Sequence, residues 1–318
     1  MSNFLAKRLL FSASVLFALS LFVFLLFYIA PGDPARVIAG DKATELQLVQ
    51  IRSNLGLDRP IYEQYLQFVG KALQGDLGFS YRSQQPVAKL IVTRIPATVS
   101  LVIGGVIFWL LIGIPIGIMS ARDPGGWRDR LGQTIILVGL SFPTFVLGML
   151  SLYVFYFLPR QAGFTLFPPG GYAPFLKDPL IWAWHLVLPW TTLALVTAAI
   201  YARLTRGNLL QVMGEDYIRT ARAKGLSERA VLLRHGLRST LTPLVTQLGA
   251  DIAFLLGGAI VIEQIYGLQG VGALAVQAVQ NQDRPIIIGV VMLGGLFIVI
   301  TNIVVDLLYA VLDPRIRH

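Results

Sequence analysis

Residues 215–243 read EDYIRTARAKGLSERAVLLRHGLRSTLTP, a polar and strongly basic stretch that lies between two apolar ones. The flanking runs approach the roughly 20 apolar residues that a transmembrane helix needs. Of the 318 residues in the chain, 55% are hydrophobic and only 14% are charged, whereas about 25% are charged in average soluble domains. The sequence therefore predicts an all-α membrane protein in which this stretch is the largest piece that faces the cytoplasm.

Six apolar stretches are candidates for transmembrane helices, and a polar module follows the first of them. We expect a retained first helix within residues 1–30, because its apolar run is longer than the core of a signal peptide, about 7–15 residues. Residues 31–96 are expected to form an extracytoplasmic module, residues 97–312 a five-helix core and residues 313–318 a cytoplasmic tail. The core spans are predicted at 98–119, 132–157, 186–203, 240–262 and 286–311, with a cytoplasmic loop at 204–238.

Lysine and arginine gather in alternate loops, and this pattern predicts the orientation. If the N-terminus lies inside, the cytoplasmic pieces hold 15 of these residues and the two short outer loops, at 159–185 and 263–285, hold 3. Basic residues mark the cytoplasmic side of membrane proteins. We therefore expect both termini in the cytoplasm. The net charge of +9 is explained by these loops and does not indicate a nucleic-acid partner.

Two helices are predicted within the module. Thr44 and Gln47 fit a capping box at the start of the first helix. Pro60 begins the second helix, whose apolar residues recur on one face: Ile61, Tyr65, Phe68, Val69 and Leu73. We expect this face to pack on the module's own core or to lie at the lipid interface, in preference to docking on a partner.

The basic stretch has the signals of two short helices. Residues 215–224 place acidic side chains at the start and basic side chains at the end of the first, which complements the helix dipole. Gly225 can take the left-handed conformation that ends a helix, and Ser227 can cap the second, at residues 228–237. Ala221 and Gly225 leave room for another surface to approach the backbone. The alternative is a basic loop attracted to anionic lipid headgroups.

Several classes of function lack the residues that they require. The chain has no cysteine and three scattered histidines, so no disulfide framework, thiol nucleophile or cysteine-based metal site is expected. A P-loop needs a glycine-rich run that ends in Gly-Lys-Ser or Gly-Lys-Thr, but the one Gly-Lys pair, Gly70-Lys71, precedes an alanine. We expect no catalytic residue, no metal and no cofactor bound by this chain. It is therefore not expected to be an enzyme.

Four segments of the chain resemble one family of transport proteins. DYIRTARAKGLSERAVLLRHGLR at 216–238 is similar to the cytoplasmic loop of the B-type permease subunits of binding-protein-dependent ABC importers of dipeptides, oligopeptides and nickel. The other three segments resemble the same subunits: APGDPA at 30–35, LGLDRPIYEQYLQFVGKALQGDLGFS at 55–80 and EQIYGLQGVGALAVQAVQNQDRP at 263–285. Together the segments are spread along the chain from residue 30 to residue 285.

The match to the general loop pattern of ABC importer permeases is partial. That pattern has E-A-A, three residues, glycine, nine residues and I-x-L-P, and Ala221, Gly225 and Leu237 fit it. Four positions depart from it: Arg219, Thr220, His235 and Arg238. The departures leave open which residue makes a polar contact with a partner.

The resemblance implies a type I ABC importer permease fold in the bacterial inner membrane, with this chain as half of the translocation pore. It implies as partners a second six-span permease, two cytoplasmic ATPases that bind ATP-Mg, an extracytoplasmic substrate-binding protein, a peptide substrate and membrane lipid. It also implies that residues 215–226 form a coupling helix that docks in a groove of the ATPase. The coupling residues carried over are Glu215, Asp216, Tyr217, Arg219, Thr220, Ala221, Lys224, Gly225 and Leu226.

One ionisable residue lies in the middle of a predicted span. Asp251 has Gln247 four residues before it on the same helix face, and such residues usually face a bundle interior or a cavity. Asp251 could bind the amino group of a peptide, or it could pair with a neighbouring helix or the partner permease. Asn302 adds a polar residue near the cytoplasmic end of the last span. Our hypothesis is that these three residues line the translocation path.

Two kinds of alternative stay open. Within the ABC importers, the substrate could be nickel or another small solute instead of a peptide. A protein of another class, an ATP-independent carrier or channel, would often show internal repeats with paired broken helices, and the sequence shows no such symmetry. A membrane-embedded hydrolase lacks a credible nucleophile and base.

Overall fold

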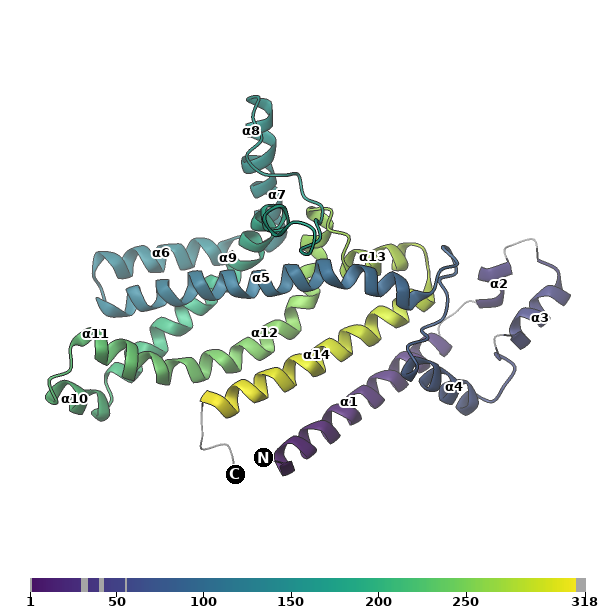
Figure 1. Cartoon of the computed structure of the whole chain (residues 1–318), viewed down its shortest axis with the longest axis horizontal. Helices are drawn as coiled ribbons and strands as arrows, with labels where there is room; N and C mark the ends of the chain where they lie inside the picture. Colours follow the sequence, from purple (N-terminus) through teal and green to yellow (C-terminus); the bar gives the residue numbers. More distant parts are fainter. Residues whose placement is uncertain (1, 30–33, 40–42, 55, 313–318) are drawn as a thin grey trace. The chain divides into compact units, whose positions relative to one another are not determined.

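The computed structural model describes residues 2–29, 34–39, 43–54 and 56–312 (Figure 1). The described residues form helices and loops, and one isolated bridge, between Phe79 and Pro86, is their only β-type pairing. The predicted all-α class is thereby confirmed. The chain divides into two compact units, one of Met1–Ile95 with Leu274–Val299 and one of Pro96–Ala273 with Ile300–His318.

The first unit combines the N-terminal helices with a hairpin from near the C-terminus. It contains α1 (Ser2–Ile29), α2 (Pro34–Ala39), α3 (Glu45–Asn54), α4 (Ile61–Leu73), the start of α5 (Val87–Arg122), most of α13 (Val271–Gln280) and the first part of α14 (Arg284–Leu312). Its buried core joins α5, α13 and α14 through Val87, Ile91, Leu274, Ala278 and Ile286.

The two predicted module helices are present, and the apolar face of the second packs within the chain. The Thr44 amide donates to Gln47 Oε1 over 3.0 Å and the Gln47 amide to Thr44 Oγ1 over 3.4 Å, which confirms the capping box. Tyr65 of α4 meets α1, because its hydroxyl pairs with Ser20 Oγ over 2.9 Å. Its ring centroid lies 5.4 Å from that of Phe24. This face of α4 therefore meets α1 of the same chain, outside the module in which it was expected to pack, and Ile61 and Leu73 on it stay 40% and 84% exposed.

A buried carboxylate fixes the loop that precedes α5. Asp283, between α13 and α14, is almost fully buried. It accepts hydrogen bonds from Ser80 Oγ at 2.5 Å and from the amides of Tyr81 and Arg82 at 3.2 and 3.3 Å. Burying a charge is costly unless it is hydrogen-bonded, so these contacts hold the loop against the start of α14.

The second unit holds the remaining helices. They are the rest of α5, α6 (Trp127–Ser141), α7 (Thr144–Leu152), the π-helix η1 (Tyr153–Phe157), α8 (Leu158–Gln161), α9 (Pro179–Met213), α10 (Asp216–Ala223), α11 (Glu228–Ala230), the π-helix η2 (Val231–Gly236), α12 (Leu237–Ile265) and the end of α14. In Figure 1, α10 and α11 lie at one end of α9 and α12. The short helices α10 and α11 of the basic stretch are therefore positioned by the ends of the long helices α9 and α12.

Close contact between α5 and α9 centres on two glycines one turn apart. A Cβ added to Gly113 would lie 2.6 Å from the Ala198 carbonyl oxygen, and one added to Gly117 would lie 2.6 Å from that of Ala202. Small residues spaced by four allow transmembrane helices to approach closely. The ring of Trp109, one turn before Gly113, packs on α9 as well, with its centroid 5.9 Å from that of Tyr201. This stripe of α5 therefore sets the separation of the two helices.

The predicted spans all fall on helical residues, with one correction. Among the described residues, four helices are long and apolar enough to cross a membrane, or five if α6 and the helix from Thr144 to Gln161 count as one broken span. The span predicted at 240–262 lies within α12, which is 29 residues long but is not one of these helices. The span predicted at 132–157 is not continuous, because the chain bends by 96° after Ser141. Pro143 follows at this break, and proline lacks the amide that would continue a helix.

Candidate functional site

The short helix predicted in the basic stretch is present. Helix α10 follows Glu215, whose backbone is extended with φ −71° and ψ 151°, and it ends at Lys224. Gly225 then has φ +78°, and its amide donates to the Arg222 carbonyl over 2.9 Å. A positive φ is favourable only for glycine, so the expected helix stop is confirmed.

The inner face of α10 is anchored to the second unit. Ile218 is fully buried and Ala221 is 5% exposed, and both pack with Val231 of η2. Val212 and Met213, at the end of α9, pack against the same cluster. The structure differs here from the expectation that Ala221 leaves room for a partner, because its side chain faces the chain's own core. Its small size allows α10 to approach η2.

The outer face of α10 carries the other predicted coupling residues. Arg219 Nη1 donates to Asp216 Oδ1 over 3.3 Å, and the Tyr217 hydroxyl donates to Ser239 Oγ over 3.0 Å. Tyr217 and Leu226 keep 45% and 40% of their surface exposed. All of the other predicted coupling residues are exposed, namely Glu215, Asp216, Tyr217, Arg219, Thr220, Lys224, Gly225 and Leu226. The segment is thus fixed on one side and presents polar and apolar groups on the other.

The turn after α10 is held by a local ion pair and a cap. Arg222 forms two hydrogen bonds to the Glu228 carboxylate, at 2.8 and 3.3 Å. Ser227 Oγ accepts from the Ala230 amide over 3.4 Å, which confirms the predicted cap. The second predicted helix begins at Glu228 and continues through η2 into α12. Motion of α10 would therefore be carried directly into α12.

A buried ion pair that the sequence analysis missed joins the first turn of α6 to α9. Arg206 of α9 donates from Nε and Nη2 to the two carboxylate oxygens of Asp129, both at 2.8 Å. Ser120 Oγ and the Gly125 amide donate to the same carboxylate, at 2.5 and 2.9 Å. The pair joins the ends of α5, α6 and α9. One sequence signal was available, since Asp129 is an acid between two arginines in a basic loop.

A second missed carboxylate organises the loop between α12 and α13. Glu263 is fully buried and accepts from Thr98 Oγ1 at 2.6 Å and from the Ala273 amide at 2.8 Å. Thr98 Oγ1 in turn accepts from the Val271 amide over 2.8 Å. Gly270 lies against this carboxylate so closely that a Cβ would overlap it. The predicted outer loop therefore has a polar core of its own.

The structure brings together two of the three residues predicted to line the path. Gln247 Nε2 donates to Asp251 Oδ1 over 2.9 Å on α12. The other carboxylate oxygen is buried and lacks a hydrogen-bond partner among the described residues. The Tyr201 hydroxyl is buried beside this carboxylate. Asn302 of α14 is exposed and is not part of this group.

Within the described part of the chain, no three histidine, cysteine or carboxylate side chains gather where they could hold a metal ion. The chemistry that the two candidate regions offer is therefore hydrogen bonding, charge and apolar contact. The region around α10 offers a surface for a macromolecule. The region around Asp251 offers a carboxylate within the span predicted at 240–262, and an unpaired polar atom is costly inside a membrane.

Comparison with known proteins identifies the family. Residues 113–318 match the family of binding-protein-dependent transport system inner membrane components, and residues 1–102 match the N-terminal region of such membrane components. The glutathione transport system permease protein GsiC of Escherichia coli (strain K12) is 42% identical over 319 residues, which cover all of both chains. GsiC of Shigella flexneri serotype 5b is 41% identical over the same length.

Solved structures share the fold at low sequence identity. A structure of the MetNI methionine ABC transporter in an inward-facing conformation has a TM-score of 0.55 at 19% identity, covering 70% of this chain and 96% of that one. An amino acid ABC transporter has a TM-score of 0.51 at 16% identity, with coverage of 70% and 93%. These likenesses confirm the predicted type I permease fold. The chain therefore belongs to the family of binding-protein-dependent transport system inner membrane components, the permease subunits of ABC importers.

Proposed function

We propose that this permease forms half of the pathway of a peptide importer and that α10 is the element through which ATPases on separate chains drive it. The observation that carries the coupling role is the two-sided character of α10, which is buried through Ile218 and Ala221 and exposed through Tyr217, Lys224 and Leu226. The peptide class is supported by the full-length identity to glutathione permeases, because glutathione is a small peptide.

The proposed assembly contains a second permease, two ATPases that bind ATP-Mg and an external substrate-binding protein, in the bacterial inner membrane with both termini of this chain in the cytoplasm. Closure of the ATPases would displace α10. Its buried cluster with Val231, Val212 and Met213 would pass this displacement to α9 and α12. Packed interiors transmit such displacements because they do not deform freely.

Reversal of one charge on the exposed face tests the coupling role. We expect Lys224→Glu to lower co-purification of the ATPases and ATP-driven uptake by at least about tenfold, which corresponds to roughly 1.4 kcal/mol of binding. The control is Lys177→Glu, the same change on an exposed residue of the predicted outer loop. The measurement is mass spectrometry of the chains that co-purify in mild detergent, beside uptake by whole cells.

Equal ATPase recovery from the two variants would contradict the coupling role. A chain that purifies without ATPases and still supports uptake would favour the ATP-independent carrier. The test substitutes Lys224 and not Ala221, because Ala221 is buried and a charged side chain there would disturb the fold itself.

The peptide assignment is tested at Asp251. Its second carboxylate oxygen is buried beside the Tyr201 hydroxyl and offers a negative charge to an ammonium group, so Asp251→Asn is expected to reduce uptake of a free dipeptide about tenfold, as loss of a charged hydrogen bond of roughly 1.5 kcal/mol would. Uptake of the N-acetylated dipeptide, which lacks the ammonium, should change little. Asp58→Asn, at an exposed position of the module, is the control. Unchanged dipeptide uptake at normal complex levels would refute this role for Asp251.

A further inference from the structure

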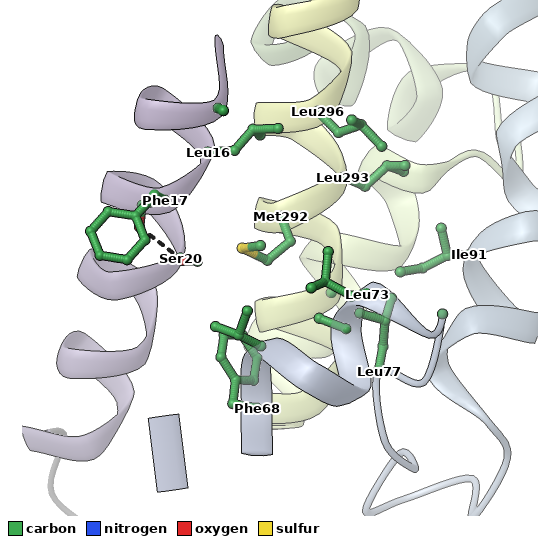
Figure 2. A pocket seen from close by; sticks show the side chains of 15 residues that line it. Leu16, Phe17, Ser20, Phe68, Leu73, Leu77, Ile91, Met292, Leu293 and Leu296 are labelled. Atoms are coloured by element: carbon green, nitrogen blue, oxygen red, sulfur yellow. Dashed lines mark hydrogen bonds between the residues drawn. The ribbon is translucent and has the colours of Figure 1, made fainter. Parts of the chain in front are cut away.

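The first unit contains an apolar cavity that the transport function leaves unexplained. Its volume is about 460 Å³, and it opens at the surface of the unit. Figure 2 shows its walls, which come from three helices: Leu16 and Phe17 of α1, Phe68 and Leu73 of α4, and Met292 and Leu293 of α14. Ile91 of α5 and Leu77 of the preceding loop close it on a further side.

The cavity offers no free hydrogen-bonding side chain. Among its fifteen lining residues, Ser20 is the one with a hydroxyl, amide or charged side chain. The Ser20 hydroxyl is already engaged, since it lies 2.8 Å from the Phe17 carbonyl oxygen and 2.9 Å from the Tyr65 hydroxyl. A peptide or a water chain inside would leave its polar groups unsatisfied, which is costly. An occupant must therefore be hydrocarbon over its whole buried length.

Two walls of the cavity are helices that can cross a membrane. Both α1, over Leu10–Phe27, and α14, over Arg284–Leu307, are long and apolar enough to span it, and only 11% and 22% of these windows are buried within the protein. On α1, the rings of Phe11, Phe17 and Phe22 are more than half exposed. The medium around such surfaces is the acyl chains of the bilayer.

We propose that this cavity binds one acyl chain of a membrane phospholipid. Its volume is about three times that of a cavity of roughly 150 Å³ that holds one benzene, which leaves room for a chain of about 18 carbons. A transmembrane helix of a partner is about 10–12 Å wide, so no more than about one of its turns would fit. The proposal does not depend on the substrate or on the ATPase contact.

The bound chain would connect three elements of the unit. Among the described residues, α1 meets α4 through the Ser20–Tyr65 pair and the rings of Phe17, Phe24 and Phe68 around it. Leu19 of α1 meets α14 directly, against Gly295. An acyl chain between these contacts would fill a void that otherwise forfeits dispersion energy on all its walls. The lipid would thus stabilise the docking of α4 on α1 and α14.

A photoreactive lipid tests the site in the assembled complex. The complex is reconstituted into vesicles of phosphatidylethanolamine and phosphatidylglycerol that contain a phosphatidylethanolamine with a diazirine in the middle of one acyl chain. After illumination, we expect labels on lining residues such as Leu16 and Met292. Ala13→Phe places a ring in the cavity, because Ala13 lines it, and should reduce this labelling about tenfold, the effect of roughly 1.4 kcal/mol.

The matched control is Ala18→Phe, the same change on the same helix at an exposed position outside the lining. It should leave labelling of the cavity unchanged. A second filling variant from another wall, Ala72→Phe on α4, keeps the test valid if Ala13→Phe does not assemble. Labels spread evenly over the exposed face of α1 and insensitive to both filling variants would overturn the proposal. Crosslinks between lining residues and another protein chain would overturn it as well, because they would identify a subunit contact.

Discussion

Asp129→Ala is expected to destabilise the permease by about 3–5 kcal/mol, the usual cost of removing one partner of a buried ion pair. The Asp129 side chain is 6% exposed and that of Arg206 is 26% exposed, so solvent screens their attraction little. The substitution leaves the Arg206 guanidinium without its carboxylate and removes the acceptor of Ser120 and of the Gly125 amide. Three helix ends lose their common contact at once.

The measurement is the fraction of the complex that stays monodisperse in detergent after heating to a series of temperatures. Glu228→Ala removes one partner of the exposed Arg222 pair, whose side chains are 41% and 68% exposed, and should cost at most about 1 kcal/mol. The double variant Asp129→Ala/Arg206→Met should recover part of the loss, because no buried charge is then left unpaired. Equal losses of stability in Asp129→Ala and Glu228→Ala would contradict the inference that the Asp129–Arg206 pair holds the three helix ends together.

The features that the sequence predicted correctly are those whose signals lie close together along the chain. The capping box joins Thr44 and Gln47, three residues apart, and the helix stop depends on Gly225 alone. The cap of Ser227 on the Ala230 amide is equally local. Span positions follow from the length of each apolar run, which is also a local property. These predictions needed no knowledge of which helices touch.

The features that the sequence analysis missed depend on partners far apart in the chain. Arg206 and Asp129 are 77 positions apart, and Thr98 and Glu263 are 165 apart. Nothing in the spacing of these residues pairs them, because the pairing follows from the order in which the helices pack. The sequence places each carboxylate near the end of a span, but it does not decide whether the side chain is exposed to solvent or buried. The residues that pack around it decide this.

Helix orientation explains the different outcome at Ala221. A small side chain at this position allows either a partner or the chain's own η2 to approach α10 closely, so its size alone does not decide between them. The apolar neighbour Ile218, one turn earlier, is the signal that decides between them, since residues three apart share a helix face. Ile218 is fully buried, and Ala221 lies on its face. Any partner must therefore bind the opposite face of α10.

Gly170→Ala is expected to be more damaging than the same change at the next residue, Gly171. Gly170 has φ +128° and Gly171 has φ +80°, and both values disfavour a residue with a side chain. A Cβ on Gly170 would also overlap the carbonyl oxygen of Tyr266, whereas a Cβ on Gly171 would meet nothing within 4 Å. Backbone strain and overpacking each cost about 1–3 kcal/mol. Gly170→Ala carries both penalties and Gly171→Ala only the first.

Neither side of the Gly170 contact can move away at low cost. The Gly170 carbonyl oxygen lies 2.8 Å from His185 Nδ1, and the Gly171 amide donates to the Tyr266 carbonyl over 2.8 Å. Tyr266 is itself buried, and its hydroxyl bonds to Thr192 over 2.7 Å and also to Ser151. Thermal stability and the yield of assembled complex should therefore fall clearly further for Gly170→Ala than for Gly171→Ala. Equal losses in the two variants would show that backbone conformation alone sets the cost, and that the outer loop does not pack on Tyr266 as closely as the structure has it.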